Sequence, residues 1–442
     1  MNRFLTCVLV AAGLTYSIGA TAQTTYYFPP LTGNAWATTD PAALGWNTAL
    51  IDELYDFLEE RDSKAFIVLK DGRIVMERYF GSFTQDSAWY WASAGKSLTS
   101  FMVGMAQEQG FLNINTPTST YLGAGWTSAT PGQEAAITVR NQLTMTSGLD
   151  DGVPNKDCTD PACLQYLAAP GTRWAYHNAP YTLLDEVLEA ATGQSLNPFF
   201  NSQMRNRTGM TGLWVQIDYN NVFVSKPRTM ARYGSLILNR GVWNGDTLLH
   251  DQAYFTAMTT PSQTLNPAYG YLWWLNGQSS FRLPGVQLSI PGMLIPTAPA
   301  DMYCALGKND QKLYVAPSQN LVVVRMGNPA GDDLSLVPIT FDRELWERLS
   351  AIMAGPTATD APAEAAAELR VFPSPARQLL NVRYQGGEEV AYLQLWNGQG
   401  SVVKTQPMAP AFSIEDLAPG VYFLTAHAAN GRQLARRAWV KH

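Results

Sequence analysis

The sequence predicts an α+β protein made of two bodies. The first is an antiparallel β-sheet flanked by N- and C-terminal helices, with a helical subdomain attached, and the second is a small all-β sandwich. Two observations carry this prediction. Between residues 48 and 353 the patterns run in the order helix, strands, a long helical and loop-rich stretch, strands and helix. Beyond residue 368, about seventy residues hold only short alternating runs separated by turn signals.

Hydrophobic periodicity defines the elements of the larger body. The segment Thr48–Arg61 has apolar residues at helical spacing and acidic residues on the opposite face. The pair Asp71-Gly72 separates two strand-like runs and is a strong hairpin signal. In chain order, the predicted elements are helix 48–61, strands 65–69, 73–80, 312–315 and 321–326, and helix 341–353.

A linker is predicted between the two bodies. Residues 355–368 lack core-forming side chains and contain two prolines. Residues 23–354 carry 21 Lys and Arg against 29 Asp and Glu, whereas residues 369–442 carry 8 against 4. The two predicted domains, 23–354 and 369–442, therefore differ in the sign of their net charge.

The first 22 residues have the features of a signal peptide. Arg3 is their only charge, an apolar stretch follows it, and Ala20-Thr21-Ala22 forms an A-x-A cleavage pattern. The alternative is a membrane anchor, but the apolar run is short for one and is interrupted by Thr and Ser. We therefore expect an exported protein that is not an integral membrane protein.

Composition argues against several classes of protein. With 46% hydrophobic and only 15% charged residues, the chain of 442 residues is neither disordered nor a coiled coil. Its four histidines and four cysteines show no zinc-finger or HExxH spacing, so we expect no metal and no other cofactor. A net charge of −6 and a pI near 5.3 argue against a nucleic-acid partner.

A serine and a lysine three residues apart form the first candidate catalytic motif. Ser93 and Lys96 lead into the apolar run 101–106, so on a helix their side-chain ends can meet on one face. The lysine can take the hydroxyl proton, especially where burial lowers its pKa. The spacing alone is weak, because Ser93 could be a helix N-cap and Lys96 a solvated side chain. Ser401 and Lys404 repeat it on a strand-like run, where the geometry is wrong.

A Tyr-x-Asn segment strengthens the catalytic interpretation. Tyr176, His177 and Asn178 follow a Pro-Gly-Thr turn and precede an expected helix over 181–192. A phenol with a pKa of ~10 is a poor base, but beside Lys96 we expect the phenolate to be favoured and a proton relay to become feasible. The alternatives are a buried tyrosine that satisfies a backbone group and, for His177, a packed loop residue that does not line a cleft.

With these motifs the chain resembles the serine β-lactamase and penicillin-binding-protein superfamily, nearest its class C-like esterases and 6-aminohexanoate-dimer hydrolases. Supporting runs follow in the expected order at residues 137–149, 192–196, 230–234 and 239–243. The resemblance implies a β-lactamase/transpeptidase-like fold and acyl transfer. It implies Ser93 as the nucleophile, Lys96 and Tyr176 as acid and base, and Asn178 as a group that orients the substrate or Lys96.

The third motif departs from the family pattern, which is Lys-Thr-Gly or His-x-Gly on a strand. One alignment places Ala305-Leu306-Gly307 in that position, which removes the cation and makes the backbone N–H groups of Ser93 and Lys308 the oxyanion hole. A shifted register would offer Lys308 itself as the cation. We favour the first alignment. Because it lacks a cation that would bind a carboxylate, it makes an ester or amide a more favoured substrate than a β-lactam or a peptide.

The tail resembles the C-terminal sorting domain of the type IX secretion system. The matching segments are 371–376, 395–400 and 417–422, followed by a basic end at Lys441-His442. The resemblance implies contact with the secretion machinery, transit through the periplasm, and release or display at the cell surface. The alternative is a carbohydrate-binding or adhesion module.

Together these features predict an exported serine hydrolase that acts on an ester or amide, including peptide-like substrates. The alternatives are a β-lactamase or D,D-peptidase, or a penicillin-binding sensor that is acylated without turnover. In an exported protein, Cys158 and Cys163 are expected to close their short loop with a disulfide.

Overall fold

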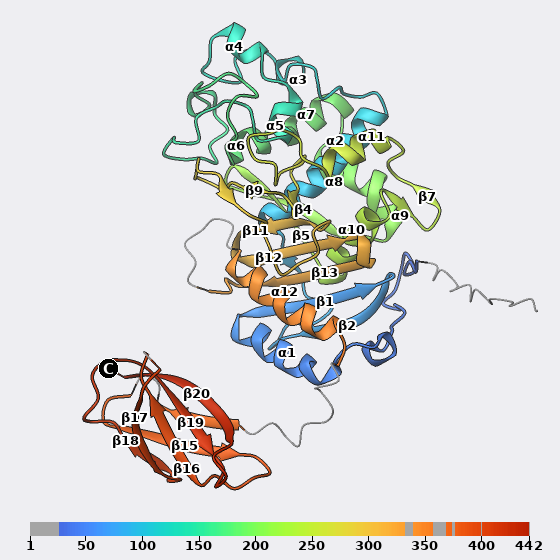
Figure 1. The fold of residues 1–442 in the computed structure, drawn as a ribbon. Helices are drawn as coiled ribbons and strands as arrows, with labels where there is room; N and C mark the ends of the chain where they lie inside the picture. The colour runs from blue at the N-terminus through green and yellow to red at the C-terminus, as the bar shows by residue number, and fades with distance from the viewer. Residues whose placement is uncertain (1–25, 332–338, 357–367, 374–375, 399, 442) are drawn as a thin grey trace, which may run out of the picture. The chain divides into compact units, whose positions relative to one another are not determined.

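The computed structural model describes residues 26–331, 339–356, 368–373, 376–398 and 400–441 (Figure 1). The chain divides into two compact units, Met1–Gly355 and Pro356–His442. The predicted signal peptide, residues 1–22, lies outside the described residues, as does most of the predicted linker, so both stay predictions. Across the described part of the chain, no helix combines the length and the apolar composition that a bilayer crossing requires.

A six-stranded antiparallel sheet forms the centre of the first unit. Its strands lie in the order β2 (Arg73–Tyr79), β1 (Ser63–Lys70), β13 (Leu321–Gly327), β12 (Gln311–Ala316), β11 (Tyr303–Gly307) and β8 (Trp274–Leu275). The two ends of the unit meet at its middle, where β1 pairs with β13 and Val68 lies opposite Val323. This sheet confirms the predicted architecture.

Helices cover both faces of the sheet. The terminal helices α1 (Ile51–Glu60) and α12 (Thr340–Met353) lie side by side over one face (Figure 1). Phe57 of α1 stacks on Phe341 of α12 with ring centroids 5.7 Å apart. On the other face, α10 (Pro227–Leu238) packs so closely on β12 and β13 that Gly234 has no room for a side chain. The two terminal helices show helical periodicity in the sequence because each buries one apolar face against the sheet.

The helical subdomain lies between β2 and β11 in the sequence (Figure 1). Its helices are α2 (Gly95–Glu108), α3 (Ser119–Leu122), α4 (Pro131–Ala135), α5 (Val139–Leu143), α6 (Asn178–Thr182), α7 (Leu184–Thr192), α8 (Leu196–Phe200), α9 (Asn206–Thr208) and α11 (Gln252–Met258). Short strands accompany them: β3 (Trp89–Tyr90), β5 (Asn220–Ser225) and β4 (Gly212–Ile217) in one sheet, β6 (Val242–Trp243) with β7 (Asp246–Thr247), and β9 (Ser280–Phe281) with β10 (Ile290–Pro291).

The helix predicted over 181–192 differs in detail from the observed one. It begins earlier, at Asn178, and is divided into α6 and α7 at Leu183. Leu183 itself keeps near-helical dihedral angles of φ −64° and ψ −11°. The two helices therefore behave as one helix with a distorted turn, which periodicity alone does not reveal.

A buried polar network ties the sheet to α12. Lys312 of β12 is fully buried and lies 2.7 Å from Asp342 of α12 and 3.1 Å from Asp310. The Tyr314 hydroxyl also donates to Asp342, at 2.7 Å. Beside them, the Arg325 guanidinium of β13 donates to backbone carbonyls of the β11–β12 turn at 3.1 Å. Such groups are stable inside a protein only when they are paired, so this network is sensitive to loss of any one member.

The second unit is an all-β sandwich. One sheet holds β14 (Glu368–Phe372), β15 (Leu379–Gln385) and β18 (Ala411–Ser413), and the other holds β17 (Val402–Pro407), β16 (Tyr392–Trp396), β19 (Gly420–His427) and β20 (Gln433–Lys441). Leu380 and Leu393, from different sheets, share one core with Trp439. The predicted all-β tail is confirmed, although the short strands β14 and β18 were not predicted. Lys404 of the second Ser-x-x-Lys copy lies on β17 and pairs with Asp416.

Replacing Asp342 tests the buried network. Asp342→Ala should lower the free energy of unfolding by about 3–5 kcal/mol, because it removes the nearest acid from a buried lysine. Urea unfolding followed by tryptophan fluorescence measures this, since Trp346 packs against Tyr314 with centroids 5.5 Å apart. Asp246→Ala, which breaks the partly exposed pair with Arg207, should cost at most about 1 kcal/mol. Equal losses in the two variants would contradict this account.

Candidate active site

Ser93 lies in a 3-10 turn, Ala92–Ala94, that leads directly into α2. The turn is held from behind by Trp91, whose fully buried indole donates to the Ser225 hydroxyl of β5 at 2.7 Å. Ala92 has φ 47°, a left-handed value that costs energy for a non-glycine residue and is frequent at functional turns. Ser93 is half-buried at the N-terminal end of a 14-residue helix, where developing negative charge is stabilised.

Lys96 is buried one helical turn further along α2. Its Nζ lies 3.8 Å from the centroid of the Tyr181 ring and 5.4 Å from that of Tyr176. Burial lowers the pKa of Lys96 to about 7, although the negative charges of Asp157 and Asp185 act in the opposite direction. A large share of Lys96 is therefore the free amine at neutral pH, and this form can accept a proton.

Tyr176 lies between Ser93 and an aromatic cluster. Its hydroxyl shares a hydrogen bond with Ser93, and its ring stacks on Trp274 with centroids 5.8 Å apart. Trp174 and Tyr269 pack against the same ring. Burial raises the pKa of Tyr176 above its ordinary value, and the hydrogen bond with Ser93 offsets only part of that effect. The expectation of a favoured phenolate differs from this result, because desolvation acts on the phenol more strongly than the neighbouring lysine does.

Asn178 is held in one orientation by Asp157. Its Nδ2 donates to Asp157 Oδ1 at 2.7 Å, and its own Oδ1 is buried without a partner among the described residues. A carboxylate can only accept, so the amide nitrogen must face Asp157 and the amide oxygen must face away. The hydrogen bond to Asp157 therefore fixes the orientation of the amide.

Among the described residues, no hydrogen bond joins His177 to Ser93, Lys96 or Tyr176. His177 is buried, and neither ring nitrogen has a partner in the described part of the chain. Burial lowers its pKa to about 4, and the charges that act on it belong to Asp151, Asp150, Lys156 and Arg173. It is therefore a neutral, buried residue, and its predicted role in lining a cleft stays a prediction.

The third motif meets the Ser93 turn through Gly307. A Cβ on Gly307 would lie 2.4 Å from the Trp91 carbonyl oxygen and 3.0 Å from the Ala94 nitrogen. The end of β11 therefore packs backbone to backbone on the turn, which only glycine permits. Ala305, two residues earlier on the same side of the strand, is buried, whereas the Lys308 side chain is exposed. This arrangement supports the alignment that places Ala305 in the position of the missing cation.

Three further residues of the site were missed from the sequence: Asp157, Tyr181 and Asp185. Asp185 of α7 is buried, accepts from Asn221 at 2.9 Å, and has its pKa raised to about 7 by burial. The available signal was an acid within the apolar stripe of a helix, directly after two leucines. Asp157 gave no signal beyond its position next to Cys158.

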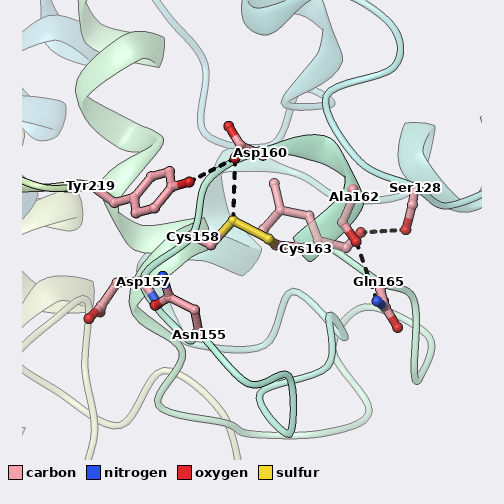
Figure 2. The surroundings of a disulfide bond; sticks show 10 residues. Ser128, Asn155, Asp157, Cys158, Asp160, Ala162, Cys163, Gln165 and Tyr219 are labelled. Atoms are coloured by element: carbon pink, nitrogen blue, oxygen red, sulfur yellow. Dashed lines mark hydrogen bonds between the residues drawn. A yellow bond between two sulfur atoms is a disulfide. The ribbon is translucent and has the colours of Figure 1, made fainter.

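Cys158 and Cys163 form a disulfide with their Cα atoms 5.9 Å apart, as predicted (Figure 2). Together with Asp160, they are the one group of potential metal ligands found among the described residues. Their sulfur atoms are joined to each other, so the group cannot supply two thiolate ligands. Cys304, on β11, is buried and free.

Comparison with known proteins identifies both parts of the chain. Residues 51–337 match the model of the β-lactamase family. The chain belongs to the β-lactamase family. Residues 370–441 match the secretion system C-terminal sorting domain. In sequence, an uncharacterised protein of Alkalihalophilus pseudofirmus is 27% identical over 303 residues, which cover 60% of this chain and 83% of that protein.

Solved structures of the β-lactamase fold resemble the first unit. A candidate β-lactamase from Bacteroides dorei is 18% identical and covers 70% of this chain and 99% of its own, with a TM-score of 0.56. A candidate 6-aminohexanoate-dimer hydrolase from Bacillus anthracis is 18% identical and covers 69% and 83%, with a TM-score of 0.52. A penicillin-binding-protein homologue from Caulobacter crescentus is 12% identical and covers 73% and 99%, also with a TM-score of 0.52. At these identities the likeness shows the fold.

Membership of the β-lactamase family makes the chain a hydrolase-like protein, because members of this family are serine hydrolases. The sorting domain indicates export to the outside or to the cell surface. The first unit thus has the fold of the β-lactamase family, and the second is a domain that directs the protein to secretion.

A methyl group at Gly307 tests the backbone contact at the Ser93 turn. Gly307→Ala should lower the free energy of unfolding by about 1–3 kcal/mol, because either β11 or the turn must move. Gly132→Ala in α4 is the matched control, since no atom lies within 4 Å of its added methyl, and it should be neutral or stabilising by up to about 1 kcal/mol. Thermal unfolding of both variants measures the difference. Equal stability of the two variants would show that β11 does not press on the turn.

Proposed function

We propose that this chain is an exported serine hydrolase that cleaves an ester or amide bond through an acyl-enzyme on Ser93. One observation carries the proposal. A buried lysine with a pKa of about 7 lies one helical turn after a half-buried serine, and Tyr176 contacts both. A nucleophile beside a base that is unprotonated near neutral pH is the arrangement required for covalent catalysis.

In the acylation step, Ser93 Oγ attacks the substrate carbonyl carbon. Its proton passes to the Lys96 amine through the Tyr176 hydroxyl, which accepts the serine proton and donates its own. The neutral phenol suits this relay, because the hydroxyl is present to donate throughout. Proton transfer by positioned groups of this kind contributes roughly 10²–10⁴-fold in rate.

The negative oxygen of the tetrahedral intermediate needs donors that are already in place. The backbone N–H groups of Ser93 and Lys308 are the candidates, because Gly307 brings the end of β11 against the turn that carries the serine. Loss of one such donor lowers kcat by roughly 10²–10³-fold in other hydrolases. Collapse of the intermediate returns the proton to the leaving alcohol or amine and leaves the acyl group on Ser93.

Deacylation reverses the same proton path. Water enters after the leaving group departs, gives up a proton through Tyr176 towards Lys96, and attacks the acyl carbonyl. Ser93 then recovers its proton. No separate glutamate motif for deacylation is present in the sequence, so the Tyr-Lys route serves both half-reactions.

The charge of the site favours neutral ester or amide substrates over substrates with a carboxylate. Ala305 replaces the cation that would receive a carboxylate, and Asp157 and Asp185 place acids near Lys96. The β-lactamase, D,D-peptidase and penicillin-sensor alternatives all need recognition of an anionic substrate.

Export through a type IX pathway completes the proposal. The sorting domain supports secretion, and we propose that residues 1–22 direct the chain first into the periplasm. The second unit then contacts the secretion machinery.

Replacing the nucleophile tests the reaction class. Ser93→Ala should lower the kcat for p-nitrophenyl acetate by roughly 10³–10⁶-fold, as loss of the nucleophile does in other serine hydrolases. Ser401→Ala is the matched control, since Ser401 belongs to the second Ser-x-x-Lys copy and precedes a strand, and it should leave the rate unchanged. If Ser93→Ala hydrolyses the ester at the wild-type rate, the proposal fails.

Parallel assays separate the alternatives, because nitrocefin turnover indicates a β-lactamase and a stable fluorescent-penicillin adduct without turnover indicates a sensor.

The protonation state of Lys96 predicts the pH dependence. Only the free amine accepts the serine proton, so kcat/KM for a neutral ester should rise with pH through a midpoint near 7, the pKa of Lys96. The rate should then stay level up to pH about 9, because the pKa of Tyr176 is raised. Measurements between pH 5 and about 9 decide the point. A rate that falls as pH rises through 7 would exclude Lys96 as the base.

A further inference from the structure

Residues 155–163 form a compact loop beside the candidate site, and the disulfide closes its second part, from Cys158 to Cys163. Within the loop, the Asp157 amide donates to the Asn155 side chain at 3.0 Å, and the Cys163 amide donates to the Asp160 carbonyl at 2.9 Å. Figure 2 shows Asp157 and Asp160 leaving the loop in different directions, with Asp160 meeting the Tyr219 hydroxyl. The loop therefore directs the Asp157 carboxylate to Asn178 and the Asp160 carboxylate to Tyr219.

Asp157 faces the segment that carries Tyr176 and Asn178. Its carboxylate accepts from Asn178 Nδ2 at 2.7 Å, and the neighbouring Lys156 carbonyl accepts from the Ala179 amide at 3.0 Å. Two consecutive loop residues thus bond to two consecutive residues of α6. This double attachment holds the Asp157 carboxylate in register with the Tyr-x-Asn segment.

The Asp157 carboxylate also acts on Lys96. The Lys96 Nζ lies over the rings of Tyr176 and Tyr181, and the carboxylates of Asp157 and Asp185 act on it electrostatically. Asp157 has the larger electrostatic effect of the two acids, and it raises the pKa of Lys96 against the effect of burial. Asp185 is on α7, whereas Asp157 directly precedes Cys158 of the disulfide.

We propose that Asp157 is a positioning residue for the reaction, anchored next to the Cys158–Cys163 disulfide so that its carboxylate orients Asn178 and places a negative charge near Lys96. This inference rests on the proposed function. Its consequence is that the loop sets the pH at which the hydrolase becomes active. An opened loop would release the carboxylate and leave Lys96 less basic.

The test is the pH dependence of kcat/KM in the full chain. Asp157→Asn keeps an acceptor for Asn178 but removes the charge, so the midpoint of the acid limb should move down by roughly one pH unit. Asp157→Glu, which restores a carboxylate, should return the midpoint towards that of the wild type. Asp160→Asn is the matched control, because Asp160 lies in the same loop and bonds to Tyr219 instead, and its midpoint should not move.

The disulfide is tested separately with Cys158→Ser/Cys163→Ser. Its midpoint should shift in the same direction as that of Asp157→Asn, and reduction of the wild type should reproduce the shift while leaving the double variant unchanged. If the pH midpoint of Asp157→Asn equals that of the wild type, the carboxylate does not have this role. If the midpoint of the double variant equals that of the wild type, the disulfide does not have its role. Either result can occur while Ser93→Ala still abolishes turnover, so this inference can fail without the proposed function. Should Asp157→Asn fold poorly, Asp157→Ser, which also removes the charge, tests the carboxylate in its place, and the comparison of reduced and oxidised wild type tests the disulfide.

Discussion

Between Gly307 and the Trp91 carbonyl there is no room for a side chain, since a Cβ on that glycine would lie 2.4 Å from the oxygen. The central sheet and the helical subdomain meet at this contact, and Ser93 lies two residues beyond it. Behind the strand, Arg325 holds the carbonyls of the β11–β12 turn, and Lys312 and Asp342 join β12 to α12. The site is thus supported by rigid elements, which is how reactive geometry is kept within fractions of an ångström.

Burial determines the protonation states in this site. Desolvation disfavours any charged form, so it lowers the pKa of the Lys96 amine and raises that of the Tyr176 phenol. One environment therefore leaves the phenol neutral as a donor and a large share of the amine neutral as an acceptor. Asp157 and Asp185 moderate this effect by favouring the ammonium. The pairing of a desolvated base with a desolvated acid needs no histidine, which suits a chain with only four of them.

Local patterns predicted much of the fold and of the site. The hairpin at Asp71-Gly72, the two terminal helices and the tail strands follow from periodicity and turn residues, which neighbours in the sequence decide. Ser93 and Lys96 share a helical turn, so their relation was also visible. The direction of the Tyr176 pKa shift was not visible, because it depends on burial within the four-ring aromatic cluster that Tyr176 forms with residues such as Trp274. The burial that lowers the pKa of His177 was likewise not visible in the sequence.

The sequence by itself determined the β-lactamase-like and sorting-domain parts, the order of their elements, the disulfide pairing and the short motifs. Each of these depends on residues close together in the chain or on a pattern spread along it. Only the tertiary structure decided that Asp157 and Asp185 face Lys96, and that Gly307 closes on the Ser93 turn. The reason is physical. Desolvation and electrostatic interaction depend on distances between segments far apart in the sequence, and these distances exist only once the sheet and the helical subdomain have packed together.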